Sequence, residues 1–357
     1  SWTEVADLGT GNTGGSGNSG STNTSTLNFG GTPSYKTATE EWTTTPAADF
    51  TKENLGQVYY NSGSNAFKVT EQSVPGGTWA SSGSMNTARG YGAGGGPNDS
   101  FIYAAGYSPP GGSVLTEVWD GSSFTEVADV NTAKYYIGHG GNTAAMWIAT
   151  GSPGSTTNTE TWNGSSWTEV NDANTARYKA SSAGTATAGL LISGQDGPPR
   201  TANVEAWDGT SWTETHNVNS ARSDMGGFGI QSSATIVGGE NTAPTLAACE
   251  SYNGSSWSEI TEFNTSRYSS GGFGSDKDNG IVFGGGDPPS NRVAVEYWNG
   301  TSWTELAEMA TARYANSQHS SLGATSGKAA GGNPSPGYTA NTEDFVASTV
   351  NKTITVS

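Results

Sequence analysis

The amino-acid sequence predicts an all-β fold, and three observations support this prediction. The chain of 357 residues contains 52 glycines, while charged residues make up only 13% of it. Aromatic residues make up 10% and include 12 tryptophans, more large apolar side chains than a disordered chain would carry. Short motifs recur along the chain about every 45 residues. Together these features are typical of short strands that are joined by tight turns and packed through aromatic side chains.

The most regular motif is a block of the form Trp-Asn/Asp-Gly-Ser/Thr-Ser-Trp/Phe. Its Asn-Gly or Asp-Gly step predicts a tight hairpin, because both residues tolerate positive φ. A short apolar run that ends in glycine precedes each block, as in residues 236–239, and a glycine-rich segment precedes that run. We therefore predict four strands in each repeat, called a to d in chain order. The last aromatic residue of each block begins strand d, at Trp79, Phe124, Trp167, Trp212, Trp257 and Trp303.

Two charged series run through the repeats at constant offsets. A basic residue follows ten positions after nearly every strand d aromatic, and a glutamate stands two positions before the aromatic of strand c. Because strand direction alternates, both series fall on the face that holds the d–a and b–c loops. We predict repeated structural ion pairs; a polar funnel that binds an anion is the alternative. The basic residues are Arg89, Lys134, Arg177, Arg222, Arg267 and Arg313, and the glutamates are Glu40, Glu117, Glu160, Glu205, Glu250, Glu296 and Glu343.

Four strands at this period predict a β-propeller, with one sheet, or blade, for each repeat. Seven glycines end a predicted strand b, so we expect seven four-stranded blades in a single domain that spans residues 1–357. Residues 2–5 resemble a strand d without a preceding strand c, and we expect this N-terminal strand to complete the last blade. A strand extension is predicted for residues 346–357. The seven glycines are Gly31, Gly106, Gly151, Gly194, Gly239, Gly285 and Gly332.

These features together resemble kelch repeats. The resemblance rests on the glycine pair after strand b, the downstream aromatic residue and the second tryptophan shortly after it, and it covers nearly the whole chain. It implies a propeller, although the hairpin here is shorter and more uniform than in most kelch proteins. It does not imply one function, since propellers serve as enzymes and as binding modules.

One repeat is interrupted. Residues 44–78 are an insertion within the predicted first blade, and residues 54–62 and 65–69 predict a small hairpin in it. Residues 56–62 resemble a short element of tail-fibre and structural proteins of bacteriophages, and the Thr/Ser/Asn/Gly-rich composition resembles structural proteins of marine phages. Tyr59, Tyr60 and Phe67 are candidates for a docking handle, because aromatic residues dominate interface hot spots. The alternative is that the insertion folds back and covers its own propeller.

The sequence does not indicate catalysis. His139, His216 and His319 occupy different repeats without the spacing of a zinc site, so we expect no metal and no cofactor. Galactose oxidase, a copper enzyme similar to some kelch propellers, needs a cysteine that is crosslinked to tyrosine. The single cysteine, Cys249, instead takes a strand c position where other repeats carry Val or Thr, which predicts a place in the core.

Charge and hydropathy narrow the class of partner. A net charge of −17 disfavours nucleic acid, whose phosphates need clusters of Lys and Arg. The chain contains no run of 18 apolar residues, so we expect no membrane insertion. Because Ser1 and Trp2 begin inside a repeat, we expect the start to be a maturation point or the edge of a larger protein.

The b–c loops differ most between repeats, and prolines stiffen them. Rigid loops on a scaffold favour binding, because less conformational entropy is lost; the alternative is that the prolines only shape surface turns. The candidate binding residues are Pro109, Pro110, Pro198, Pro199, Arg200, Asp287, Pro288, Arg292 and Tyr338.

The sequence therefore favours a non-catalytic virion protein. We expect a propeller on a phage tail, fibre or capsid, in a larger assembly, that binds a host surface glycan or another virion subunit. The alternative is a bacterial extracellular propeller that binds glycans or protein partners.

Overall fold

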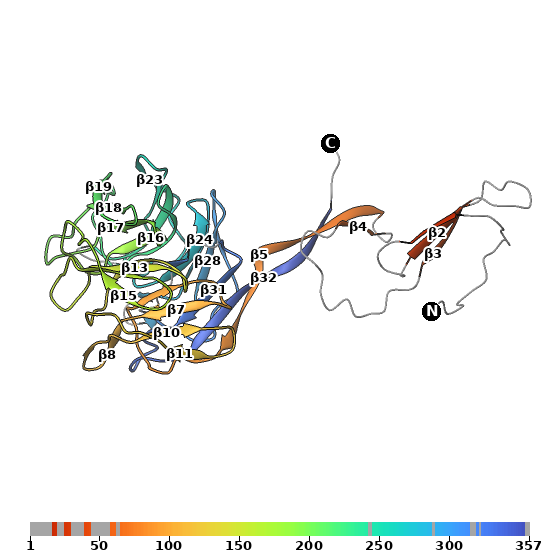
Figure 1. Ribbon diagram of the computed structural model, residues 1–357. Helices are drawn as coiled ribbons and strands as arrows, with labels where there is room; N and C mark the ends of the chain where they lie inside the picture. Colours follow the sequence, from red (N-terminus) through yellow and green to blue (C-terminus); the bar gives the residue numbers. More distant parts are fainter. Residues whose placement is uncertain are drawn as a thin grey trace, which may run out of the picture. The chain divides into compact units, whose positions relative to one another are not determined.

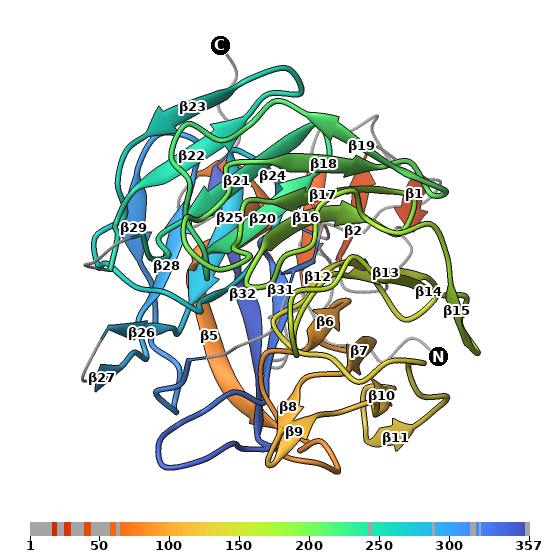
Figure 2. The ribbon, with the colours of Figure 1, turned by 90° about the vertical axis from the view of Figure 1, so that its left-hand side faces the viewer.

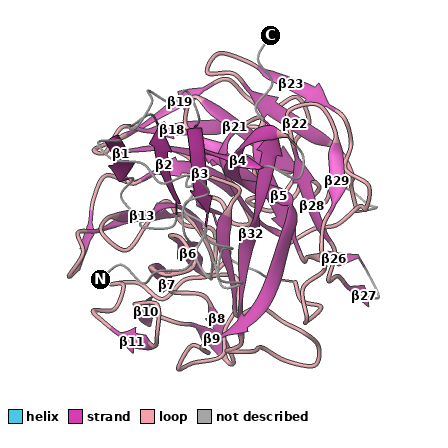
Figure 3. Cartoon of the chain, turned by 90° about the vertical axis from the view of Figure 1, so that its right-hand side faces the viewer, coloured by secondary structure: helices cyan, strands magenta, loops and turns pink. Residues whose placement is uncertain are grey.

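The computed structural model describes residues 58–61, 65–241, 245–287, 290–314, 319–320 and 323–353, and three earlier strands at 16–19, 25–29 and 39–43. Every regular element in these ranges is a β-strand (Figure 3), so the predicted all-β class is confirmed. No helix in these ranges could span a membrane. The chain divides into two compact units, Ser1–Thr70 and Glu71–Ser357, a division that the sequence did not predict.

The first unit contains a three-stranded antiparallel sheet and a hairpin. The sheet consists of β1 (Ser16–Ser19), β2 (Ser25–Phe29) and β3 (Thr39–Thr43). The hairpin joins β4 (Val58–Asn61) to the first residues of β5 (Ala66–Ser82), with Val58 opposite Val69, which confirms the hairpin predicted in the insertion (Figure 1). Gly31, the first of the seven glycines counted above, lies outside the described residues.

The second unit is a β-propeller of six small antiparallel sheets, not the seven that the glycine count predicted. The sheets follow one another around a common centre, with β12, β16, β20 and β24 toward the centre and β11, β15, β19, β23 and β29 at the periphery (Figure 2). The first three sheets are β6 (Ala93–Gly95), β7 (Phe101–Ala104), β10 (Thr116–Trp119) and β11 (Phe124–Glu126); β12 (Gly138–Gly141), β13 (Met146–Ala149), β14 (Thr159–Trp162) and β15 (Trp167–Glu169); and β16 (Ser181–Thr185), β17 (Ala188–Ile192), β18 (Val204–Trp207) and β19 (Trp212–Thr215).

The remaining sheets complete the propeller. Two b–c loops carry short ribbons, β8 (Tyr107–Ser108) with β9 (Gly111–Gly112) and β26 (Gly286–Asp287) with β27 (Ser290–Asn291), and β30 (His319–Ser320) pairs in parallel with β24. The fourth to sixth sheets are β20 (Gly226–Ile230), β21 (Ser233–Val237), β22 (Cys249–Tyr252) and β23 (Trp257–Ile260); β24 (Gly271–Asp276), β25 (Asn279–Phe283), β28 (Val295–Trp298) and β29 (Trp303–Glu305); and β31 (Ser326–Ala330), β32 (Thr342–Thr353) and β5, with β4 beyond it.

The sixth sheet explains why the count of seven was wrong. The sequence assigned Trp79 to strand d of a first blade that began before the insertion, and it assigned residues 2–5 to strand d of the last blade. In the structure β5, which carries Trp79, lies beside β32 and takes that outer position. Trp79 packs on Phe345 with ring centroids 5.5 Å apart, as Trp162 packs on Trp167 at 5.5 Å within the second sheet. Residues 2–5 lie outside the described residues.

The c–d hairpins form at the predicted positions, but the conformation of their turns differs from the predicted one. In the second sheet, Trp162 pairs with Trp167 across a connection of four residues. Only the glycine of the Asn-Gly step takes positive φ, +92° at Gly164. The Asn163 Oδ1 atom instead accepts the backbone N–H groups of Ser165 and Ser166, both at 2.9 Å, which is an Asx turn. The first residue of the step thus acts through its side chain, and not through a left-handed backbone.

The described residues of the propeller form six hydrophobic core clusters, one between each two neighbouring sheets. The cluster between the second and third sheets contains Trp147, Leu191 and Trp212, while Cys249 is 2% exposed in the cluster between the fourth and fifth. The sixth and first sheets share a cluster of their own, in which Ala330 packs with Phe101. Each sheet therefore has two packed neighbours. The core position predicted for Cys249 is confirmed, and burial raises the pKa of its thiol to about 12.

Trp79 provides a test of the sixth sheet. Because its ring packs on Phe273, Phe283 and Phe345, we expect Trp79→Ala to lower the free energy of unfolding by about 3 kcal/mol. The sheet order, with β5 beside β32, predicts a smaller loss from Trp2→Ala than from Trp79→Ala. Urea unfolding of the two variants measures both values. A larger loss from Trp2→Ala would restore the N-terminal strand as the outer strand of the last blade.

His139 makes the stability of the propeller depend on pH. Its side chain lies in β12 and is 3% exposed, and burial lowers the pKa of the imidazole to about 4. An unfolded chain binds the proton near pH 6.5, so between pH 6.5 and 4 the unfolded state holds more protons than the folded state. Stability is therefore lost as the pH falls through this window.

We expect His139→Gln to remove this component of the acid sensitivity. The wild-type free energy of unfolding should fall by about 3 kcal/mol more than that of the variant between pH 7 and pH 4. Denaturant unfolding at a series of pH values measures the difference. Because the carboxylates titrate in both proteins, parallel pH profiles would show that His139 is not the group responsible.

Candidate binding face

The d–a and b–c loops of all six sheets meet on one face of the propeller, as the sequence predicted. In each sheet, the residue after the basic residue of the d–a loop forms an antiparallel bridge with the residue after the strand b glycine. These bridges fix the two loops against each other, and we call the surface that they form the loop face. The bridged pairs are Gly90 with Tyr107, Tyr135 with Ser152, Tyr178 with Gln195, Ser223 with Glu240, Tyr268 with Gly286, and Tyr314 with Asn333.

The two charged series form the predicted ion pairs, and these pairs hold the loops in place. Arg89 Nη1 lies 2.5 Å from Glu117 Oε1, and both side chains are fully buried. The other carboxylate oxygen, Glu117 Oε2, accepts the backbone N–H of Asn86 at 2.6 Å. The glutamate thus binds both the side chain and the backbone of the loop that arrives from the preceding sheet. The remaining pairs are Lys134–Glu160, Arg177–Glu205, Arg222–Glu250, Arg267–Glu296 and Arg313–Glu343.

A second contact repeats at the same place in every sheet. The backbone N–H of the strand b glycine donates to the carbonyl of the basic residue in the following loop, as from Gly106 to Lys134 at 2.9 Å and from Gly332 to Arg89 at 3.0 Å. Gly106 has a φ of +106°, and a Cβ atom there would lie 2.8 Å from the carbonyl oxygen of Gly90. The sixth sheet and the first are joined by the same bond as the other neighbours.

Two residues after the basic residue, the loops of neighbouring sheets are joined by a backbone hydrogen bond. The five described residues at this position have φ between 51° and 62°. Tyr136, Lys179, Asp224 and Ser269 each donate the backbone N–H to the carbonyl of the preceding member of this series, at 2.7 to 3.1 Å. We call these five the axial residues; the sixth position, 315, lies outside the described residues. They are Tyr91, Tyr136, Lys179, Asp224 and Ser269.

A cluster of eight tyrosines covers much of the loop face. None of these side chains is fully buried or fully exposed. The rings contact one another across sheet boundaries, with centroids 4.0 Å apart for Tyr91 and Tyr136 and 5.3 Å apart for Tyr107 and Tyr338. We call this set the tyrosine cluster: Tyr91, Tyr107, Tyr135, Tyr136, Tyr178, Tyr268, Tyr314 and Tyr338.

Charged side chains occupy the other part of the loop face. Lys179 Nζ lies 3.0 Å from Asp224 Oδ2 and 3.0 Å from Glu240 Oε1, and it also lies 5.1 Å from the centre of the Tyr136 ring. Burial alone would lower the pKa of the Lys179 ammonium, but the two carboxylates raise it above its ordinary value. Arg200 joins this group, with Nη2 at 3.5 Å from Glu240 Oε1.

The predicted loop residues lie at different places on this face. Tyr338 belongs to the tyrosine cluster, and Arg200 lies beside the charged group and donates from Nε to Ser223 Oγ at 2.9 Å. Asp287 and Arg292 pair with each other at 2.8 Å within one loop. Pro109, Pro110, Pro198 and Pro199 are exposed at the loop tips, whereas Pro288 lies outside the described residues.

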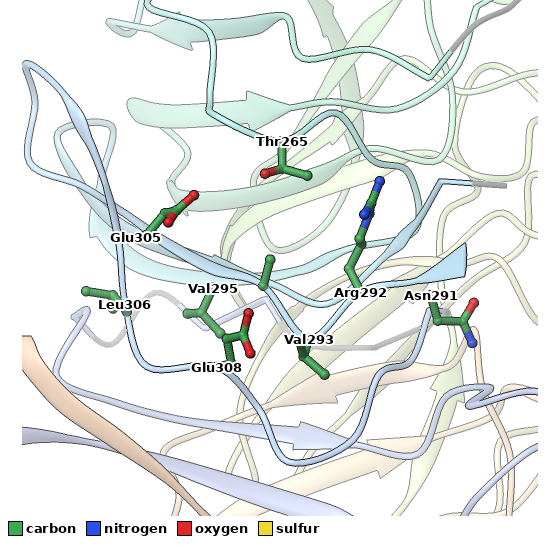
Figure 4. A pocket seen from close by; sticks show the side chains of 9 residues that line it. Thr265, Asn291, Arg292, Val293, Val295, Glu305, Leu306 and Glu308 are labelled. Atoms are coloured by element: carbon green, nitrogen blue, oxygen red, sulfur yellow. The ribbon is translucent and has the colours of Figure 1, made fainter. Parts of the chain in front are cut away.

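Arg292 also lines a cavity of about 300 Å³ in the fifth sheet. Figure 4 shows the Glu305 and Arg292 side chains at opposite ends of this cavity, with Thr265 between them. Val293, Val295 and Leu306 supply apolar surface. The cavity thus combines both signs of charge with an apolar wall, at the outer side of the sheet.

The residues of the proposed handle lie in the first unit. Phe67 is 56% exposed. Tyr59 and Tyr60 lie in β4, and their side chains are outside what the structure describes. The handle therefore remains a prediction.

The axial residues were not predicted from the sequence. Their signal was present, because each stands two positions after a basic residue whose own spacing had been recognised. Five of the six basic residues are followed by a tyrosine within two positions, in pairs such as Lys134 with Tyr135 and Arg267 with Tyr268.

In comparison with known proteins, no family model and no curated protein matches this chain. Among the described residues, no three His, Cys, Asp or Glu side chains are grouped so that they could hold a metal ion.

We expect the fully buried ion pairs to contribute far more to the free energy of unfolding than the partly exposed pairs of the loop face. Arg177→Met leaves the fully buried Glu205 without its cation, and we expect a loss of about 3–5 kcal/mol in the free energy of unfolding. The matched change Arg200→Met breaks a half-exposed pair and should cost less than about 1 kcal/mol. Urea unfolding measures both variants. Equal losses would show that burial does not set the strength of these pairs.

Proposed function

We propose that this chain is a non-catalytic binding module, and that it serves as a virion protein that attaches to a host surface glycan or to another virion subunit. The tyrosine cluster carries this proposal. Half-buried aromatic side chains that gather on one face combine apolar contact area with a polar tip, and such residues dominate binding hot spots. The buried ion pairs beneath them keep the loops rigid, which lowers the entropy lost on binding.

We also propose that the repeats are of the kelch type. This proposal is supported by the strand b glycine, the paired aromatics of strands c and d, and their recurrence in six sheets. The shared part of each repeat forms the scaffold, while the b–c loops and the axial residues vary. Loops that differ from repeat to repeat on a common scaffold can give a symmetric ring an asymmetric binding face.

The attachment to a virion is supported by features at the other end of the sixth sheet. Strand β5 runs toward the d–a loop, so Glu71, where the second unit begins, is at the end of β5 away from the loop face. The chain therefore enters the propeller from the side opposite to the tyrosine cluster. The phage-like element at residues 56–62 precedes this entry, and the exposed Phe67 lies between them. A separate segment for docking and a loop face for adhesion suit a displayed receptor-binding module.

Purified virus particles from the source of the sequence provide the test. Mass spectrometry should find this chain in the particle fraction at a constant ratio to capsid or tail proteins. Absence of the chain from every particle fraction would rule out the virion assignment.

The handle has its own test. Deletion of residues 54–70 leaves Glu71 and the rest of the sixth sheet in place, so the propeller should fold. We expect the shortened chain to be absent from assembled particles, whereas Tyr338→Ala should incorporate normally. Normal incorporation of the deletion variant would show that docking does not use the handle.

The alternative is a bacterial extracellular propeller, since a glycan-binding face suits both settings. Genes for secretion beside this one would favour that alternative, and genes for tail or capsid proteins would favour the virion.

A further inference from the structure

We propose that the axial residues form a binding site for one uncharged sugar unit at the centre of the loop face. This inference rests on the proposed function and names the ligand class and the site. The site consists of Tyr91, Tyr136, Lys179, Asp224 and Ser269, with Tyr314 beside Tyr91.

The axial side chains are in contact from one sheet to the next, with Asp224 and Ser269 buried beneath the partly exposed Tyr91, Tyr136 and Lys179. Tyr91 contacts Tyr136 at 4.0 Å between ring centroids, and Lys179 lies 5.1 Å from the centre of the Tyr136 ring. Lys179 Nζ then lies 3.0 Å from Asp224 Oδ2. Ser269 Oγ donates to Asp224 Oδ1 at 2.6 Å. Five successive loops thus bring two aromatic rings, an ammonium, a carboxylate and a hydroxyl to one place.

The backbone at these positions points to function. Tyr91 and Tyr136 take φ of 58° and 57°, a conformation that costs a bulky residue about 1–2 kcal/mol relative to glycine. Glycine occurs at many other positive-φ positions of this chain, such as Gly106 and Gly151, so the fold has access to the cheaper residue. Strain of this kind persists where the side chain is needed. Ala105, Thr150 and Ser193 take the same conformation outside the site, so it is the contact between the two tyrosine rings, and not φ alone, that points to a role for these side chains.

The charges of the site exclude ionic ligands. Lys179 already has two carboxylates, Asp224 and Glu240, each 3.0 Å away, so an anion would have to displace one of them. A cation would compete with Lys179 and Ser269 for Asp224. Arg200 lies 3.5 Å from Glu240, so two cations face two carboxylates and the site is polar and electrically neutral.

The tyrosine hydroxyls stay protonated at neutral pH. Burial first, and then the charge of Asp224, raise the pKa of Tyr136 to about 12, and the same causes raise that of Tyr91 far above its ordinary value. Each hydroxyl can therefore donate and accept a hydrogen bond. Aromatic faces, neutral hydroxyls and a fixed carboxylate beside a lysine match a ligand with an apolar ring face and several hydroxyl groups. An uncharged pyranose has both features.

Affinity electrophoresis of the whole chain tests the inference. Native gels that contain dextran, laminarin or mannan present uncharged sugars, and gels that contain alginate or heparin present anionic ones. We expect at least one uncharged polysaccharide to retard the chain and the anionic ones not to. Retardation only by the anionic polysaccharides, or by none of the five, would overturn the inference.

Substitution by glycine then locates the site without harming the backbone. Tyr91→Gly and Tyr136→Gly remove the rings where glycine is the preferred residue, so both variants should fold, as thermal unfolding can verify. We expect each to weaken binding to the retarding polysaccharide at least tenfold. Tyr297→Ala, on β28 and outside the tyrosine cluster, is the matched control and should bind as the wild type does.

The outcomes separate this inference from the proposed function. If the glycine variants bind as the wild type does while Tyr107→Ala and Tyr338→Ala lose binding, the loop face binds sugars but the axial site is wrong. If the chain is found in virus particles yet no uncharged polysaccharide retards it, the virion role stands and the axial site is again wrong. Absence from all particles combined with sugar binding that depends on Tyr91 and Tyr136 would overturn the virion role alone.

Discussion

The buried pair between a loop arginine or lysine and a strand c glutamate is the interaction on which the rest of the propeller depends. A four-residue strand such as β10 is too short to be stable alone, and the sheets must be fixed to one another. The glutamate does this by accepting hydrogen bonds from both the backbone and the side chain of the incoming loop, as Glu296 does from the Asn264 N–H at 2.7 Å and from Arg267 at 2.7 Å. Because the glutamate oxygens accept backbone and side-chain N–H groups in one place, these hydrogen bonds offset part of the cost of burying the charges.

The same interaction explains how a symmetric scaffold can carry an asymmetric site. Once the arginine is fixed, its carbonyl accepts the N–H of the strand b glycine, and the residue two positions later is forced to positive φ. The backbone at the axis is thereby determined by groups that do not depend on the axial side chain. Tyrosine, lysine, aspartate and serine can then alternate around the axis without changing the fold.

The repeat unit could be predicted from the sequence, but the arrangement at the chain ends could not. The constant offset of ten residues from strand d to Arg177 or Arg222 reflects a loop of fixed length, so the ion pairs and their common face followed directly. The blade count was wrong because a strand d such as that of Trp79 carries no information about which strand c it pairs with. Both Trp42 and Phe345 were chemically suitable neighbours, and only the three-dimensional ring decides that β5 lies beside β32.

The site was predicted less well than the fold for a related reason. Proline in the loops at Pro109 and Pro198 is conspicuous in a sequence, yet these residues are exposed at the tips, away from the contacts that join the loops. The axial residues are inconspicuous in each repeat by itself, because a single Tyr or Asp after a basic residue has no evident role. They become a site only when five loops converge. Tyr91 raises no expectation by itself until its ring is seen in contact with Tyr136 and Tyr314, which come from other loops. In a propeller the centre belongs to no single repeat, and chemistry at the axis must therefore be sought by comparing equivalent positions around the ring.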